Sequence, residues 1–290
     1  MLSQTRADAR QNDAWGIMST GAHAVDGLPA EGLCVEAGAA VPHLAPHAPC
    51  GTNLLLQPLH ALAGGMLLGA EASFPAGKPA AGDWRGQRAA TEESSAALLH
   101  SACREAQVWA AARTPLVGLP GGLRVSVCVP AAVIGGRALL ARTQSALEQS
   151  DLMPELLEVA IMEHAMGTEA QEMLLAVSAL RDMGTGVVLD QFTGGGNGLR
   201  MLRRLPVTSI WLAPALTMDM AYHREARAAV AAVITFAHAL DASVVARGVV
   251  NPVQRAILAD LGCDGGQGPL FGGPMEACIF RHALTGGLDD

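Results

Sequence analysis

The sequence predicts a (β/α)₈ barrel, an α/β fold in which strands and helices alternate around a closed sheet. From residue 54 onward, short apolar runs alternate with stretches of helical periodicity. The runs lack the polar–apolar alternation of half-exposed strands, which favours parallel strands covered on both faces. A doubly wound open sheet is the alternative, but no G-x-G-x-x-G motif follows a strand to support it. The expected strands cover residues 54–59, 65–71, 124–128, 156–161, 186–190, 209–212, 243–247 and 265–267.

Two of the expected helices have recognisable ends. Residues 168–171 form a Thr-Glu-Ala-Gln capping box, and Gly184 follows the last apolar position of that helix. Asn251 precedes a proline at the first position of a later helix, which Gly262 closes.

The composition limits the classes of function. The chain has 290 residues, half of them hydrophobic, and a formal net charge of −8 without a basic run. Nucleic acid is therefore not an expected partner. The longest apolar stretch, 228–240, is too short to span a bilayer, and the N-terminus lacks the apolar core of a secretory signal. Six scattered cysteines without C-x-x-C spacing are expected to be reduced thiols of a cytoplasmic protein.

Two regions differ in composition. Residues 1–50 are rich in Ala, Gly and Pro with little periodicity, and we expect an irregular or poorly ordered leader there. Residues 51–290 are expected to form the barrel domain. His43, His47 and Cys50 lack the second ligand pair of a zinc site, so we interpret them as an ordinary loop.

In a barrel, the side chains at the carboxyl ends of the strands line the active face. Asp190 ends one strand, and its neighbour Gln191 stands where a second carboxylate would make a metal pair. The full set at these ends is Glu71, Cys128, Ala160, Asp190, Gln191, Trp211, Arg247 and Gln267.

Ordered motifs over residues 53–286 resemble the EAL domain, a barrel family that hydrolyses the bacterial second messenger cyclic di-GMP. Residues 190–194 (DQFTG) and 202–207 (LRRLPV) are similar to the family's DDFGTG and LRRLPVD. Residues 244–249 (VVARGV) and 267–274 (QGPLFGGP) are similar to VVAEGV and QGYLFGRP. Glu71 begins an EAS triplet where the family has EAL. The resemblance implies a TIM-like barrel of the EAL type.

The resemblance also implies a role for each matching position. Glu71 and Asp190 match metal-binding carboxylates, Gln267 matches the glutamine of QGY, and Glu163 matches a glutamate that steadies the loop after DDFG. Five positions differ from the family pattern. Cys128 replaces an asparagine, Ala160 a glutamate, Gln191 an aspartate, Trp211 a lysine that helps orient the attacking water, and Arg247 a glutamate.

These replacements predict that the metal-dependent reaction is lost. Magnesium requires hard oxygen ligands, and two-metal hydrolysis needs enough negative charge to hold two ions about 3.5–4 Å apart. Arg247 instead places a permanent cation at a ligand position. We therefore expect no metal cofactor, with Mg or Mn bound only if the site is still active. We also expect Arg247 to pair with Glu71 or Asp190, which would otherwise be uncompensated.

Three functions follow, in decreasing order of support. The first is a catalytically inactive regulator that binds an unidentified protein partner. The second is a receptor that binds cyclic di-GMP without cleaving it, through Gln57, Glu71, Asp190 and Gln267. The third is a residual phosphodiesterase. Ser73 and Pro75 stand where the family has a leucine and an arginine that bind the dinucleotide. These replacements make the receptor and the residual phosphodiesterase less favoured than the regulator. The resemblance also makes a homodimer possible.

Overall fold

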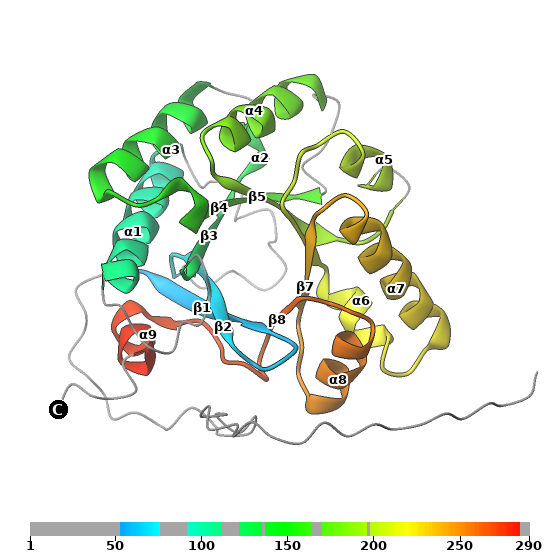
Figure 1. The fold of residues 1–290 in the computed structure, drawn as a ribbon. Coiled ribbons are helices and arrows are strands. Elements are labelled where there is room, and N and C mark those ends of the chain that lie inside the picture. Colours follow the sequence, from blue (N-terminus) through cyan, green and yellow to red (C-terminus); the bar gives the residue numbers. More distant parts are fainter. Residues whose placement is uncertain are drawn as a thin grey trace, which may run out of the picture. The chain divides into compact units, whose positions relative to one another are not determined.

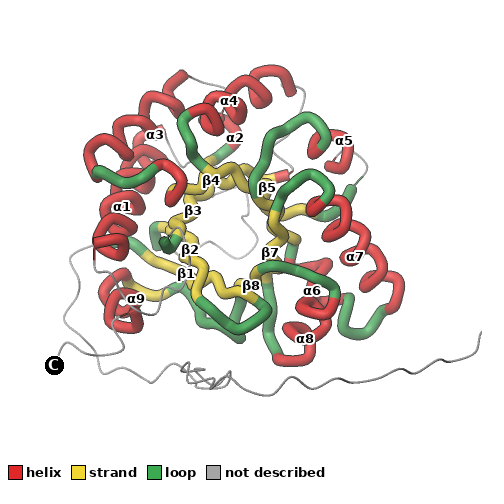
Figure 2. The backbone as a smooth tube through the Cα atoms, in the orientation of Figure 1, coloured by secondary structure: helices red, strands yellow, loops and turns green. Residues whose placement is uncertain are grey.

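Eight strands close into a barrel, and the helices lie outside it (Figures 1 and 2). The computed structural model describes residues 53–75, 92–111, 122–134, 137–163, 170–195 and 198–284. The strands of the barrel are β1 (Leu55–Ala61), β2 (Leu67–Ser73), β3 (Arg124–Val129), β4 (Leu157–Met162), β5 (Gly186–Phe192), β6 (Ser209–Leu212), β7 (Ser243–Arg247) and β8 (Gly265–Gln267). Because β1 pairs with both β2 and β8, the sheet is closed, and the predicted barrel is confirmed over the open sheet.

The first strand runs against the others. The pairings from β2 to β8 are all parallel, whereas β1 is antiparallel to β2 and to β8. The expectation of parallel strands throughout is therefore wrong for β1. A turn of only a few residues joins β1 to β2, with the N–H of Ala61 donating to the carbonyl of Met66, and such a short connection can only reverse the chain. A further short strand, β9 (Met275–Glu276), pairs with the start of β1.

The helices follow the strands around the barrel. They are α1 (Glu92–Ala111), α2 (Ala131–Ile134), α3 (Arg137–Ser150), α4 (Ala170–Asp182), α5 (Gly198–Leu202), α6 (Pro214–Asp219), α7 (Arg224–His238), α8 (Pro252–Asp260) and α9 (Ala277–Leu284).

The predicted ends of α8 and α4 are largely confirmed. Asn251 caps α8 by accepting a hydrogen bond from the N–H of Gln254, at 2.9 Å. Gly184 and Gly262 follow α4 and α8 with φ of 86° and 82°, the left-handed conformation that favours glycine after a helix. The capping box begins at residues outside the described part of the chain, as do the expected leader over residues 1–50 and the loop containing His43, His47 and Cys50.

The interior of the barrel has three levels. The middle level is apolar and takes one side chain from each of seven strands: Leu59, Leu68, Cys128, Ala160, Val188, Trp211 and Val245. Above it, at the carboxyl ends of the parallel strands, lie Glu71, Asp190, Arg247 and Gln267. Below it, polar side chains gather at the amino ends. The outward-facing side chains of the strands pack against the helices in a separate, larger core.

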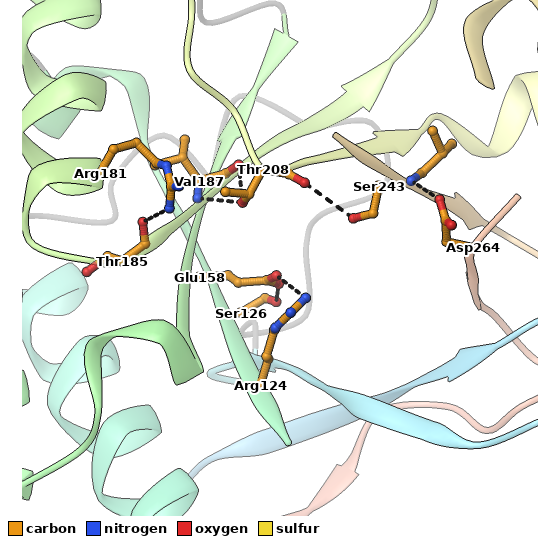
Figure 3. A network of polar contacts seen from close by, with 10 residues as sticks. Arg124, Ser126, Glu158, Arg181, Thr185, Val187, Thr208, Ser243 and Asp264 are labelled. Atoms are coloured by element: carbon orange, nitrogen blue, oxygen red, sulfur yellow. Dashed lines mark hydrogen bonds and ion pairs between the residues drawn. The ribbon is translucent and has the colours of Figure 1, made fainter. Parts of the chain in front are cut away.

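The lower level is a polar network (Figure 3). Ser126 donates to the carboxylate of Glu158 at 2.5 Å, and Arg124 lies 3.6 Å from the same carboxylate. Thr208 exchanges hydrogen bonds with the backbone of Val187 at 3.0 Å, and Ser243 donates to the Thr208 carbonyl at 3.3 Å. These contacts tie neighbouring strands together at the end of the barrel opposite the predicted site.

Within the described residues, no helix is both long and apolar enough to cross a membrane. Cys103, Cys128 and Cys263 are free thiols, as expected. Cys278 is disulfide-bonded, so the expectation of a reduced thiol is wrong for this residue. Cys34 and Cys50 lie outside the described residues.

Candidate functional site

Arg247 joins two carboxylates across the mouth of the barrel. Its Nη1 donates to Asp190 Oδ2 and its Nη2 donates to Glu71 Oε2, each at 2.5 Å. The three side chains come from the carboxyl ends of β7, β5 and β2. The predicted pairing of Arg247 with Glu71 or Asp190 is confirmed, and the arginine binds both. We call Glu71, Asp190 and Arg247 the Arg247 cluster.

The cluster is largely removed from water. The side chain of Asp190 is 1% exposed, that of Glu71 14% and that of Arg247 15%. Burial raises the pKa of Glu71, Asp190 raises it further, and Arg247 opposes both effects. Burial would lower the pKa of Arg247, but the two carboxylates outweigh it and raise this pKa, so the guanidinium stays charged.

Two glutamines lie at the same rim. Gln267 pairs with Arg247 in the sheet, and its Nε2 donates to Glu71 Oε2 at 3.1 Å. Gln57 is the β1 partner of Glu71, and its Nε2 donates to the carbonyl of Gly272 at 3.4 Å. The structure thus brings Gln267 into contact with the cluster and directs Gln57 toward the loop before β9.

Gln191 lies at an irregularity in β5. The pairing with β6 shifts between Leu189 and Phe192, and Gln191 has φ 56°, an uncommon conformation for a residue other than glycine. Its backbone N–H donates to Asp190 Oδ1 at 2.7 Å. Gln191, which stands where a metal pair would need its second carboxylate, therefore contributes a backbone N–H that holds the carboxylate of Asp190 in place.

Three of the predicted site residues belong to the apolar middle level. Cys128, Ala160 and Trp211 pack in the same cluster as Val188 and Val245. Burial raises the pKa of Cys128 to about 12, with Asp190 and Glu71 contributing, so the thiol is neutral and its role as a buried filler is favoured over a nucleophile. Trp211 is fully buried, and Arg247 Cζ lies 5.3 Å from its ring centroid.

Residues 50–274 match the profile of the EAL domain. The chain belongs to the EAL domain family. Two relatives from Pseudomonas aeruginosa are the cyclic di-GMP phosphodiesterase NbdA, 32% identical over 162 residues, and the cyclic di-GMP phosphodiesterase RocR, 30% identical over 176 residues. These alignments cover 56% and 61% of this chain but only 21% and 45% of the relatives.

Solved EAL structures share the fold. The P. aeruginosa MucR phosphodiesterase in complex with cyclic di-GMP superposes with a TM-score of 0.69 at 24% identity, over 78% of this chain and 93% of that one. The Klebsiella pneumoniae BlrP1 complex with manganese and cyclic di-GMP gives a TM-score of 0.65 at 21% identity, over 79% of this chain and 58% of that one.

Glu163 of this EAL domain holds the loop after β5. Its Oε2 accepts hydrogen bonds from the backbone N–H and the hydroxyl of Thr193, each at 2.7 Å. A Cβ on Gly198 would overlap Glu163 Oε1, so the glycine leaves room for this carboxylate. The arrangement agrees with the steadying role that the sequence motif implied.

Two features of the EAL domain were missed by sequence reasoning. One is the contact of Arg247 with the face of Trp211, although both residues were expected at neighbouring strand ends. The other is the buried Glu158, whose only signal was a charged residue inside an apolar run. Across the described ranges, no group of three His, Cys, Asp or Glu side chains could hold a metal ion.

Proposed function

We propose that this chain is a non-hydrolysing EAL-domain protein of bacterial cyclic di-GMP signalling, which acts by binding a protein partner. The observation that carries the proposal is the pair of hydrogen bonds from Arg247 to Glu71 and Asp190. The link to cyclic di-GMP comes from the family and from the names of the relatives. Because the chain spans less than half the length of the curated relatives NbdA and RocR, their activities are not transferred whole.

The donor set does not fit the divalent ions that a manganese-bound relative carries. Glu71 and Asp190 each direct an oxygen at Arg247, so these oxygens already have a cationic partner. A metal ion beside the guanidinium would be repelled, since two unit charges about 4 Å apart cost roughly 4 kcal/mol at an effective dielectric of 20. Cys128 offers a soft, protonated sulfur and Ala160 offers no ligand.

The same geometry also disfavours the binding of cyclic di-GMP at the carboxyl ends of the strands. Arg247, the cation of this cluster, already directs Nη1 at Asp190 and Nη2 at Glu71, so these donors are not directed at a phosphate group. The side-chain amides of Gln267 and Gln57 already donate hydrogen bonds, to Glu71 and to the carbonyl of Gly272 respectively. The barrel fold is kept while Glu71 and Asp190 are bonded to Arg247, which favours a role that depends on the surface of the domain rather than on this site. A cytoplasmic location remains a prediction.

Calorimetric titration with cyclic di-GMP, with and without manganese, tests the proposal together with a chromatographic assay of hydrolysis. We expect neither binding nor turnover by the wild-type chain. Binding without turnover would replace the proposal with a receptor. Manganese-dependent turnover that is lost in Glu71→Ala but kept in the surface variant Glu148→Ala would overturn it.

A further inference from the structure

We propose that Trp211 is a second barrier to metal binding, independent of Arg247. Its indole lies beside Asp190 and under the guanidinium of Arg247, so that removing the arginine charge alone leaves no room for a hydrated ion. This inference rests on the proposed loss of hydrolysis and identifies a residue that enforces it.

The sheet register places Trp211 between the strands that carry Asp190 and Arg247. Trp211 pairs with Val245, which precedes Arg247 by two residues and shares its inward face. In the same way Val188 lies one inward step below Asp190. On its other side, β5 pairs Val188 with Ser209, so Trp211 lies one inward step above Val188 and beside Asp190, with Arg247 Cζ 5.3 Å from its ring centroid.

Ala160 is a small side chain in the same apolar cluster as the ring. Both residues belong to the apolar middle level, in which Trp211 is the largest side chain and Ala160 the smallest. Protein interiors are close-packed, so a fully buried indole requires a small neighbour. The glutamate that the family has at position 160 would compete with the ring for this volume.

The indole of Trp211 fills space inside the barrel, and its ring face packs against the guanidinium of Arg247. Trp211 Nε1 has no hydrogen-bond partner among the described residues although the side chain is fully buried. An unpaired buried donor is unfavourable, so hydrogen bonding does not account for tryptophan here. Its ring face beneath a cation does account for it.

The ring of Trp211 also leaves no room for the water ligands that a bound metal ion would keep. Mg²⁺ and Mn²⁺ take near-octahedral sets of oxygens and keep several bound waters. With Arg247 removed, Glu71 and Asp190 could supply oxygens from the rim, but the lower half of the coordination sphere would meet carbon atoms of the indole. The ion would have to shed water without replacement, which opposes binding.

The experiment measures Mn²⁺ binding by calorimetry and by the shift in melting temperature, with no nucleotide present. The proteins are wild type, Arg247→Glu, Trp211→Ala and the double variant Arg247→Glu/Trp211→Ala. We expect only the double variant to bind, at least about tenfold more tightly than Arg247→Glu, because only it has both three carboxylates and space for water. The matched control Arg247→Glu/Val188→Ala opens the same level at another side chain and should remain without binding.

Two results would overturn the inference. If Arg247→Glu alone binds Mn²⁺ as tightly as the double variant, Trp211 is no barrier. Absence of binding by a folded double variant would mean that the ring does not limit the space. Circular dichroism establishes folding, and Trp211→Leu replaces Trp211→Ala if the larger cavity unfolds the barrel. Hydrolysis by wild type would instead refute the proposed function, so the two failures are distinguishable.

Discussion

Arg247 and Asp190 form a buried ion pair that links β7 to β5, with Nη1 and Oδ2 2.5 Å apart. Because Arg247 also binds Glu71 on β2, one guanidinium holds three strands together at the mouth of the barrel. Removal of this cation would leave two carboxylates close together with little access to water.

Arg247→Met should therefore destabilise the fold by about 3–5 kcal/mol, the cost of leaving a buried charge without its partner. Urea unfolding near neutral pH measures the change. Replacing an exposed arginine, Arg203→Met, is the matched control and should change stability by less than about 0.5 kcal/mol. The triple variant with Glu71→Gln and Asp190→Asn should recover part of the loss. A loss below about 1 kcal/mol for Arg247→Met would contradict the structural role.

The buried Glu158, in the polar network at the amino ends of the strands, should make the stability of the fold depend on pH. Burial raises the pKa of this carboxyl above its ordinary value of 4.5, and the hydrogen bond from Ser126 and the charge of Arg124 offset this only in part. The folded state therefore holds the proton more tightly than the unfolded state. The stability that protonation contributes is full below pH 4.5 and is lost as pH rises through the folded-state pKa.

Glu158→Gln should accordingly gain stability relative to wild type as pH is raised from about 4 to about 8. The amide oxygen can still accept the hydrogen bond from Ser126, which limits other effects of the change. Glu148→Gln on the exposed face of α3 controls for removing a charge from the chain. A difference between Glu158→Gln and wild type that is the same at every pH would refute the prediction.

The sequence predicted the parts of this structure that depend on local pattern. Apolar runs located the strands, and Asn251 with Pro252 located the start of α8. The position of Arg247 at a strand end, among carboxylates at other strand ends, was enough to predict its pairing. These predictions succeeded because strand ends of a barrel converge wherever they lie in the chain.

The features that were not predicted depend on geometry that pattern does not encode. An apolar run has no direction, so only the short turn after Ala61 shows that β1 is antiparallel. The left-handed Gln191 follows from an irregular pairing of β5 with β6, not from the residue type. Trp211 lies near the carboxyl end of β6, as predicted, but its ring packs into the apolar middle level, which the sequence did not indicate.

His60 should make the fold less stable in mild acid. Burial lowers the pKa of this imidazole below its ordinary value of 6.5, which outweighs the hydrogen bond of Nδ1 with the carbonyl of Gly65. Because the folded state disfavours the proton, stability is full above pH 6.5 and falls as pH drops toward the folded-state pKa. The ring also stacks on Phe271, with centroids 5.3 Å apart.

Thermal unfolding between about pH 5 and pH 8 tests this for wild type and His60→Phe, which keeps an aromatic ring beside Phe271. The variant should lose less stability than wild type on acidification, although it lacks the hydrogen bond to Gly65. His223→Phe, at an exposed position, is the control for removing a histidine. Equal acid sensitivity of wild type and His60→Phe would assign the effect to other groups.

Gly198→Ala should loosen the loop after β5. The new Cβ would overlap Glu163 Oε1 and would lie 2.8 Å from the ring of Phe192, so Glu163 must move away from Thr193. Loss of the two hydrogen bonds from Thr193 should cost about 1–3 kcal/mol and raise the hydrogen exchange rate of its amide. Gly195→Ala is the matched control, because its Cβ would approach no atom closer than 3.6 Å. If both alanine variants exchange the Thr193 amide at the wild-type rate, Glu163 does not hold this loop.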